Sequence, residues 1–188
     1  MLIYCGKFIH KMGLSQKKIN ELTLLAAAPK CEVRGSIIHG RGVYTTQNIK
    51  EDELICYYVG ELINKEESTK RGQDQMQKSE ETGGAAVYIF TLNDEWDLDG
   101  DFEWNIARLI NHSCSPNTIA YLEEDEKKVG IYALKDIKKD VELTFNYGFD
   151  VEQYKEHICL CGAKNCVGHI VAESQWKELE KLKQEPSC

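Results

Sequence analysis

The sequence "NHSCSPN", residues 111–117, contains the densest group of chemically active side chains in the chain. Asn111, His112, Ser113 and Cys114 are adjacent, and the Ser-Pro-Asn that follows is typical of a tight turn. Taken alone, these residues allow a nucleophile, a metal site, a binding loop or only a structural turn. The neighbouring sequence has to decide among these four interpretations.

Length and charge limit the classes of function. The chain has 188 residues, which suits one domain, and 42% apolar residues, which predicts that it folds. Its net charge of −8 argues against general nucleic-acid binding, which needs clustered Lys and Arg. The charge suits a basic partner such as a lysine-rich peptide, or it simply keeps the protein soluble. No apolar run approaches the roughly 20 residues of a membrane span.

The N-terminal region predicts a helix. Residues 22–29, "LTLLAAAP", have some features of a signal-peptide core, but an acidic residue borders them and the apolar part is short. An amphipathic helix that begins after Ser15 fits better, because serine is a good N-cap. Ile19, Leu22 and Leu25 would then share one face. Without secretion, the eight cysteines are expected to be reduced, and clustered ones to bind metal.

Short strand-like runs separated by turns make up most of the chain. These runs lie at residues 35–46, 53–63, 85–92, 127–140 and 141–149. Residues 64–84 are polar and predict a helix that leads into a loop. Residues 174–185 predict a second helix, with Trp176, Leu179 and Leu182 on one face. We therefore predict a mostly β fold (β+α) with small helical insertions.

A cysteine cluster follows in "CLCGAKNC", residues 159–166: Cys159, Cys161 and Cys166. Tetrahedral zinc sites bind thiolates at about 2.3 Å, and Gly162 would let the loop turn around one face of the ion. Three unrelated thiols are the alternative, but reduced thiols this close readily trap a metal. The fourth ligand stays open here: His157 and His169 are near, Cys114 is distant, and spacing slightly favours His169.

Residues 94–103 are strongly acidic and begin an Asp-x-Asp-x-Asp pattern at Asp97. A calcium loop needs glycine at its sixth position and glutamate at its twelfth, where Phe102 and Arg108 stand. We predict a solvated or substrate-facing acidic loop instead of a calcium site.

Two further patterns are weak by themselves. "HGRGVYT" would need a third glycine at Thr45 to match the dinucleotide-binding fingerprint, although Gly40 and Gly42 still allow a ligand close to the backbone. "TFNYGF" places three aromatic side chains on one side of a strand, a pattern that is most often plain core: Phe145, Tyr147 and Phe149.

Together these segments resemble the SET-domain family of protein lysine methyltransferases. The similar segments are "HGRGVY" (39–44, cofactor turn), "YYVGELI" (57–63, Y-x-G-E strand), "VYIF" (87–90), "RLINHSCSPN" (108–117, the R-F-I-N-H-S-C-x-P-N signature), "ELTFNYGF" (142–149, E-L-T-F-D-Y) and "CLCGAKNCVG" (159–168, post-SET zinc tail). They cover about residues 32–172 in the family's order. The resemblance implies a SET-domain fold of several small curved sheets with a pseudoknot, an exception to the rule against threading.

The resemblance also implies an organisation of the chain. It places the SET domain at 32–150 with an insertion at 64–84 and a post-SET zinc motif at 155–172. The helical patterns described above add an N-terminal extension with a helix at 1–31 and a C-terminal helix at 173–188. Residues 1–31 contain only Cys5 and Cys31, so no cysteine-rich pre-SET region is expected.

Site residues follow by the same resemblance. S-adenosylmethionine would bind His39, Gly40, Arg41, Tyr88, Asn111 and His112, and zinc would bind Cys114, Cys159, Cys161 and Cys166. This moves the expected fourth zinc ligand from His169 to Cys114. Tyr147 matches the catalytic tyrosine and Phe145 the product-specificity position, where phenylalanine implies di- or trimethylation. Asn146 replaces a commoner aspartate, and His169 stands where an aromatic or large apolar residue often closes the channel.

The prediction is a zinc-containing, S-adenosylmethionine-dependent protein lysine N-methyltransferase that acts on a basic protein or peptide, with histone tails favoured. An aromatic channel would favour the neutral amine that attacks, although free lysine has a pKa of about 10.4. The alternatives are a non-catalytic module that binds basic peptides and a methyltransferase of a non-histone protein. We expect no sequence-specific nucleic-acid binding and no membrane. The expected location is intracellular: chromatin in a eukaryote, or the cytoplasm or a host cell for a bacterial protein.

Overall fold

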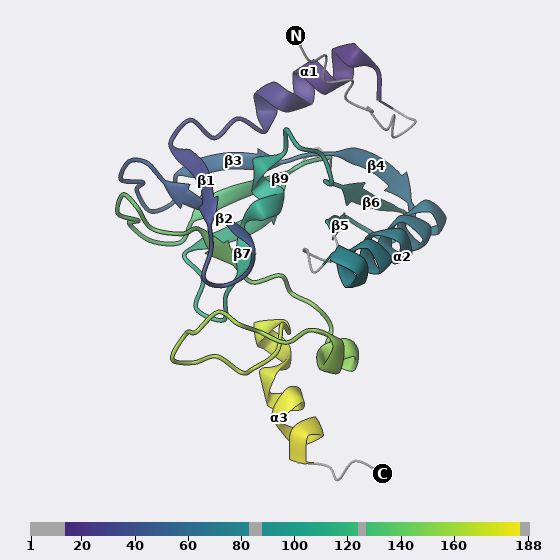
Figure 1. Cartoon of the computed structure of the whole chain (residues 1–188), viewed down its shortest axis with the longest axis vertical. Helices are drawn as coiled ribbons and strands as arrows, with labels where there is room; N and C mark the ends of the chain where they lie inside the picture. Colours follow the sequence, from purple (N-terminus) through teal and green to yellow (C-terminus); the bar gives the residue numbers. More distant parts are fainter. Residues whose placement is uncertain (1–13, 83–87, 124–126, 185–188) are drawn as a thin grey trace.

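The computed structural model describes residues 14–82, 88–123 and 127–184 of the chain. Within these residues the strands form four small sheets, and the helices lie around them (Figure 1). The predicted mostly β architecture is therefore confirmed. Residues 1–13, with Cys5, and residues 185–188 of the predicted terminal segments lie outside the described residues.

Three of the sheets are antiparallel. The first is a hairpin of β1 (Cys31–Gly35) and β2 (Arg41–Thr45). The second has the order β3 (Leu54–Tyr58), β9 (Val129–Ala133), β8 (Thr118–Leu122). The third has the order β4 (Glu61–Asn64), β6 (Trp96–Asp99), β5 (Ile89–Thr91).

The run predicted as one strand at 53–63 is divided between two sheets, as β3 and β4. Gly60 lies between them, and the backbone of Asp99 occupies the space that a Cβ at this position would need. Only glycine allows this close crossing of two chain segments. The fully buried side chains between the sheets form the main core, among them Val43, Leu98, Val129, Ile131 and Leu143. Each such side chain contributes about 1.5–3 kcal/mol relative to exposure.

The acidic stretch at 94–103 is only partly the solvated or substrate-facing loop that the sequence predicts, because Asp94, Glu95 and Glu103 are exposed but the centre of the stretch is not. Its centre forms strand β6, and Asp97 and Asp99 are only 5% and 0% exposed. Both carboxylates are ion-paired with side chains of helix α2 (Lys65–Thr82), which precedes β6 in the chain: Asp97 with Lys65 at 2.6 Å and Asp99 with Arg71 at 2.8 Å. Aspartate is rare in strands and costly to bury, so the sequence pattern indicated a loop. The ion pairs from α2 offset that cost.

A short parallel pair brings the two most distinctive segments together. β7 (Asn111–His112) pairs with β10 (Thr144–Phe145). The turn that follows β7 is held to the same strand, because the backbone N–H of Ser113 donates to Phe145 O at 3.1 Å. The side chain of Asn117 donates to Glu142 O at 2.7 Å. Residues 111–117 are thus both a strand and a tight turn.

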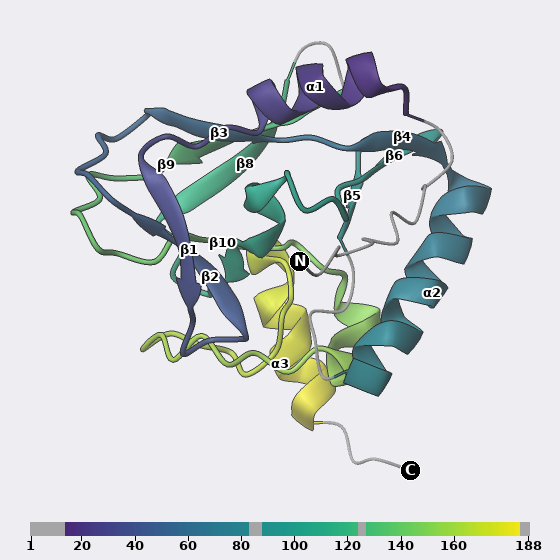
Figure 2. The ribbon, with the colours of Figure 1, turned by 45° about the horizontal axis from the view of Figure 1, so that its top comes forward.

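Three α-helices and three 3₁₀ segments complete the described part of the chain. They are α1 (Gln16–Leu25), α2 (Lys65–Thr82), α3 (Trp176–Gln184), η1 (Ile106–Leu109), η2 (Val151–Glu156) and η3 (Glu173–Gln175). The Ser15 N-cap is confirmed, since its Oγ accepts from Lys18 N at 3.3 Å. α1 lies along β3 and β4 (Figure 2), where Leu22 packs against Val59. No described helix combines the length and apolar character that crossing a membrane requires.

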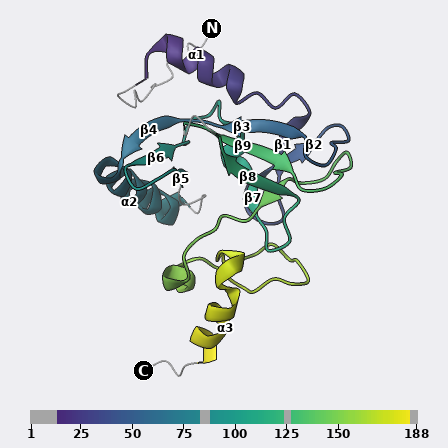
Figure 3. The same cartoon turned by 180° about the vertical axis from the view of Figure 1, so that it is seen from behind.

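α2 stands beside the β4–β6–β5 sheet (Figures 1 and 3). α3 lies at the end of the molecule opposite α1, below β7 in the same views. The predicted apolar face of α3 is confirmed: Leu179 is buried against Val151 and Val171, with Trp176 beside it. The Trp176 ring N–H also donates to Val171 O at 3.2 Å. α3 therefore holds the cysteine-rich tail from below.

Candidate functional site

A cavity of about 980 Å³ lies between the sheets and the C-terminal tail. Its volume is at the upper end of what ligand pockets usually have. All of the residues that the sequence predicts for cofactor binding, product specificity and catalysis line it: His39, Gly40, Arg41, Tyr88, Asn111, His112, Phe145 and Tyr147. They come from the β1–β2 turn and the first residue of β2, the segment before β5, β7, and β10 with the residues just after it. The fold therefore gathers side chains more than 100 positions apart in sequence.

One wall of the cavity is aromatic. The Tyr147 ring centre lies 4.9 Å from that of Phe145 and 5.7 Å from that of Phe149. Phe145 stacks on Phe90 at 6.2 Å, and Phe90 contacts Tyr58 at 5.5 Å. All five residues line the cavity, so the "TFNYGF" stripe forms a cavity wall, although Phe145 is also part of the main core.

Tyr147 is held by one side-chain and one backbone hydrogen bond. Its hydroxyl donates to Ile110 O at 3.0 Å, and its backbone N–H donates to His112 Nδ1 at 3.2 Å. Burial raises the pKa of Tyr147 above its ordinary value, and the neighbouring Tyr88 acts in the same direction. The phenol is therefore neutral at physiological pH, with an oxygen that can still accept a hydrogen bond.

His112 is a packed, neutral residue. Burial lowers its pKa to about 4, which leaves the imidazole uncharged at pH 7. Nδ1 already accepts from Tyr147, and Nε2 lies 3.6 Å from Cys114 Sγ. Both ring nitrogens are engaged, so the arrangement does not favour a general base.

Asn111 fixes the glycine turn. Its side-chain amide donates to Arg41 O at 3.0 Å, and it also reaches His39 O at 3.3 Å and Glu142 Oε1 at 2.8 Å. The side chain thus holds the backbone of the turn in place across the mouth of the cavity.

Glu142 is the centre of this arrangement, and our sequence reasoning assigned it no role. Besides Asn111, its carboxylate accepts from Ser36 Oγ at 2.7 Å and Tyr44 OH at 2.8 Å. The carboxylate also fills the space where a Cβ of Gly42 would be. The second glycine of the turn therefore makes room for a protein side chain, not for a ligand. The only sequence signal was its place in "ELTFNYGF".

Arg108 is a second residue that sequence reasoning missed. Its guanidinium lies over the Tyr88 ring, 5.0 Å from the centre, and its Nε donates to Phe102 O at 3.0 Å. It lines the cavity and pairs with Asp101 at 3.7 Å. Arg108 therefore holds one face of Tyr88.

The four predicted metal ligands form one cluster. The thiol sulfurs of Cys114, Cys159, Cys161 and Cys166 all lie within 4.8 Å of one another. Cys114 Sγ is 3.8 Å from Cys159 Sγ and 3.9 Å from Cys166 Sγ. Four sulfurs at about 2.3 Å from a tetrahedral zinc would be about 3.8 Å apart, so the cluster fits that ion. Backbone N–H groups support it: Cys114 N donates to Cys161 Sγ at 3.5 Å and Gly168 N to Cys166 Sγ at 3.4 Å.

The two histidines considered as fourth ligand lie elsewhere. His169 Nδ1 is 2.8 Å from Tyr154 O, and its ring packs on the Tyr154 ring at 4.9 Å. His157 contacts Phe149 at 4.7 Å and lines the cavity, whereas His169 does not. The spacing along the chain favoured His169 because it lies three residues after Cys166. Spacing along the chain does not show which side chains meet in the folded protein.

The tail that carries the cysteines forms one side of the cavity. Ile158 and Leu160 line it although their side chains are 58% and 62% exposed. The sequence does not predict a role for either residue, because the pattern "CLCGAKNC" indicates only a metal site formed by its cysteines. The tail therefore closes the cavity with apolar side chains next to the cysteine cluster.

The SET domain family model matches residues 40–148. The "Variant-silencing SET domain-containing protein" of Plasmodium falciparum is 35% identical over 140 residues, and "Histone-lysine N-methyltransferase, H3 lysine-4 specific" of Candida albicans is 37% identical over 139. "Histone-lysine N-methyltransferase, H3 lysine-36 specific" of Homo sapiens is 34% identical over 167. These matches cover 73%, 72% and 83% of this chain but only 6%, 13% and 6% of the relatives.

Proposed function

The chain belongs to the SET-domain family, and on that premise we propose that it is a protein-lysine N-methyltransferase that uses S-adenosylmethionine. The observation that carries the proposal is the cavity itself, which joins the turn at residues 39–41, β7 and the Tyr147 hydroxyl in one space. The backbone of the turn, Tyr88, Asn111 and His112 would hold the cofactor. When bound, it supplies a methyl group on a sulfonium, an electrophile that needs no further activation.

The residues of the chain then have to deliver a neutral amine. The aromatic wall described above, with Tyr147 in it, would disfavour an ammonium group by desolvation. The Tyr147 oxygen can hold the amine so that its lone pair faces the methyl group. No side chain needs to be a strong base, because the proton can leave to water before transfer. The neutral, fully engaged His112 is consistent with this.

Zinc would bind Cys114, Cys159, Cys161 and Cys166. Such a closed four-thiolate site is structural and supplies no chemistry to the reaction. Its effect would be to hold the tail, with Ile158 and Leu160, against β7 and the cavity.

We favour a histone tail as substrate, because two of the relatives described above are named histone-lysine methyltransferases. A basic peptide would meet exposed acidic side chains at the cavity: Asp150 and Glu156. Asp97 and Asp99 of the acidic stretch are not available to it, because both are buried and ion-paired. A histone substrate would place the protein at chromatin.

Incubation of the chain with methyl-labelled S-adenosylmethionine tests the proposal. We expect label in lysines of core histones, and mass spectrometry of a labelled cell lysate would show whether other proteins are preferred. Binding of histone peptides without transfer at any pH would instead support the non-catalytic module. Label only in non-histone proteins would leave the enzyme but remove the histone proposal.

Phe145→Tyr should shift the products toward monomethyl-lysine. Phe145 is 6% exposed, lies between the rings of Tyr147 and Phe90, and lines the cavity, so we expect an added hydroxyl to take up room that a second methyl group needs. Mass spectrometry of a peptide product measures the ratio of methylation states. Phe102→Tyr is the matched control, since Phe102 stacks on Trp104 and does not line the cavity. An unchanged ratio in Phe145→Tyr would remove the assignment.

A further inference from the structure

Gln75 is a buried polar residue of helix α2. Among the α2 side chains that the structure describes, Gln75 is the buried one, at 6% exposure. A glutamine in such a place costs free energy unless its amide is hydrogen-bonded. Its Nε2 donates to Asp99 Oδ1 at 3.3 Å, and its Oε1 accepts from the backbone N–H of Tyr88 at 2.8 Å. Gln75 therefore bridges α2, β6 and the segment before β5.

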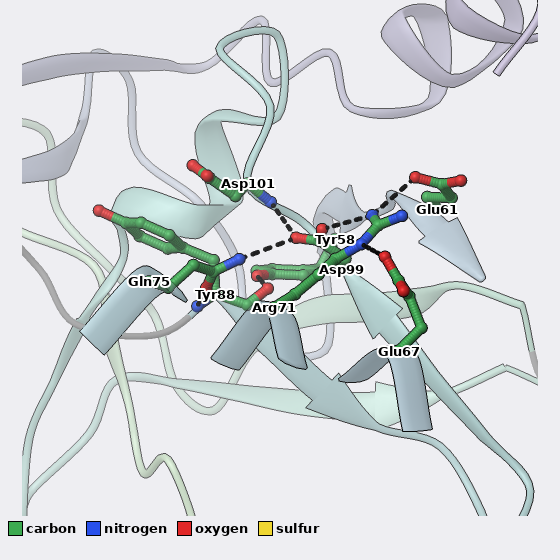
Figure 4. A network of polar contacts seen from close by, with 8 residues as sticks. All are labelled: Tyr58, Glu61, Glu67, Arg71, Gln75, Tyr88, Asp99 and Asp101. Atoms are coloured by element: carbon green, nitrogen blue, oxygen red, sulfur yellow. Dashed lines mark hydrogen bonds and ion pairs between the residues drawn. The ribbon is translucent and has the colours of Figure 1, made fainter. Parts of the chain in front are cut away.

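Arg71, one turn earlier on α2, supports the same bridge (Figure 4). Its guanidinium contacts three carboxylates: Asp99 at 2.8 Å, Glu61 at 2.7 Å and Glu67 at 2.7 Å. Asp99 is fully buried, and its Oδ1 also accepts from Asp101 N at 3.1 Å. Since a buried carboxylate is stable only when paired, Arg71 is what allows Asp99 to serve as an acceptor for Gln75.

The bridge ends at a cavity wall. The Tyr88 carbonyl accepts from Tyr58 OH at 2.7 Å and Gly100 N at 2.8 Å, while its N–H is held by Gln75. Both polar groups of the Tyr88 backbone are thus fixed, and its ring lines the cavity beneath Arg108. Of these hydrogen bonds, the one that the Tyr88 N–H donates to Gln75 is made by a residue of α2.

We propose that Gln75 and Arg71 are positioning residues that fix Tyr88 against the cavity, so that α2 sets the affinity of the site for S-adenosylmethionine. This inference rests on the proposed function, because Tyr88 is taken to contact the cofactor. Loss of the Gln75 amide leaves the Tyr88 N–H without its acceptor and Asp99 without one of its donors. The Tyr88 backbone is then held only through its carbonyl, so the position of its ring in the cavity is less tightly fixed.

Gln75→Met tests the inference, since methionine keeps the length and helix propensity of glutamine but makes neither hydrogen bond. Gln73→Met is the matched control, because Gln73 lies on the same helix and is exposed. Binding of S-adenosylmethionine is measured by titration calorimetry, amide hydrogen exchange at Tyr88 by mass spectrometry, and folding by circular dichroism. We expect about tenfold weaker binding and faster exchange at Tyr88 in Gln75→Met, and neither change in Gln73→Met.

The outcomes separate this inference from the proposed function. If the wild-type chain and Gln75→Met bind S-adenosylmethionine equally tightly, the inference is overturned. This holds even if the variant is less stable, because Gln75 would then have only a structural role. If circular dichroism shows that Gln75→Met is unfolded, Arg71→Lys is used as the test variant instead. Lysine keeps the positive charge but cannot contact all three carboxylates. An unchanged affinity of Arg71→Lys for S-adenosylmethionine would also overturn the inference. If the wild-type chain does not bind S-adenosylmethionine, the proposed function fails and the inference falls with it.

Discussion

Tyr147→Phe is expected to lower methyl transfer to lysine about 100-fold or more while S-adenosylmethionine still binds. The substitution keeps the ring in the aromatic wall but removes the hydroxyl that we propose orients the amine. Loss of a positioned hydrogen-bonding group of this kind typically costs about 10²–10³ in rate. Single-turnover transfer of labelled methyl to a histone peptide, with calorimetry for cofactor binding, measures both quantities.

The same substitution also removes the hydrogen bond from Tyr147 to Ile110 O, which contributes about 1 kcal/mol to stability. Tyr132→Phe is therefore the right comparison, because its hydroxyl also makes one hydrogen bond, to Glu123 at 2.8 Å, and lies outside the cavity. Tyr132→Phe should transfer at the wild-type rate. A Tyr147→Phe protein as active as this control would contradict the assigned role of the hydroxyl.

Cys114→Ser is expected to have the second large effect: loss of most of the bound zinc and release of the tail from the cavity. The wild-type chain should carry about one zinc, since its four thiols fit a tetrahedral site. A serine hydroxyl is a much poorer ligand for zinc than a thiolate. Structural zinc binding provides about 10–16 kcal/mol, so its loss should weaken the attachment of residues 159–166 to β7. Elemental analysis gives the zinc content, and trypsin cleavage at exposed Lys164 reports the release of the tail.

Cys31→Ser is the control for this experiment, because Cys31 is a half-buried thiol outside the cluster. It should keep the wild-type zinc content and the wild-type rate of cleavage. α3 should stay packed in both proteins, since Leu179 contacts Val151 and Val171 without involving the cysteines. Full zinc in Cys114→Ser would show that another residue completes the site, and would remove Cys114 from it.

Much of the local structure follows from the sequence. The Ser15 cap and the apolar faces of α1 and α3 are read from spacing, because side chains that share a helix face recur every three to four residues. The spacing of residues does not predict that 53–63 divides into two strands, nor that 96–99 forms a strand. In both places the deciding contact is with a distant segment: Asp99 backbone against Gly60, and Arg71 against the Asp99 carboxylate.

By itself, the sequence determined which chemistry was available: clustered thiols for a metal, an alternating aromatic stripe, and a signature shared with a family. The tertiary structure decided which residues act together. It set Cys114 beside Cys159 and not His169, closed the cavity with Ile158 and Leu160, and made Glu142 the support of the glycine turn. The physical reason is that metal preference and side-chain periodicity are properties of a few neighbouring residues. Burial, pairing of β7 with β10 and compensation of a buried charge instead depend on segments that meet only when the whole chain has folded.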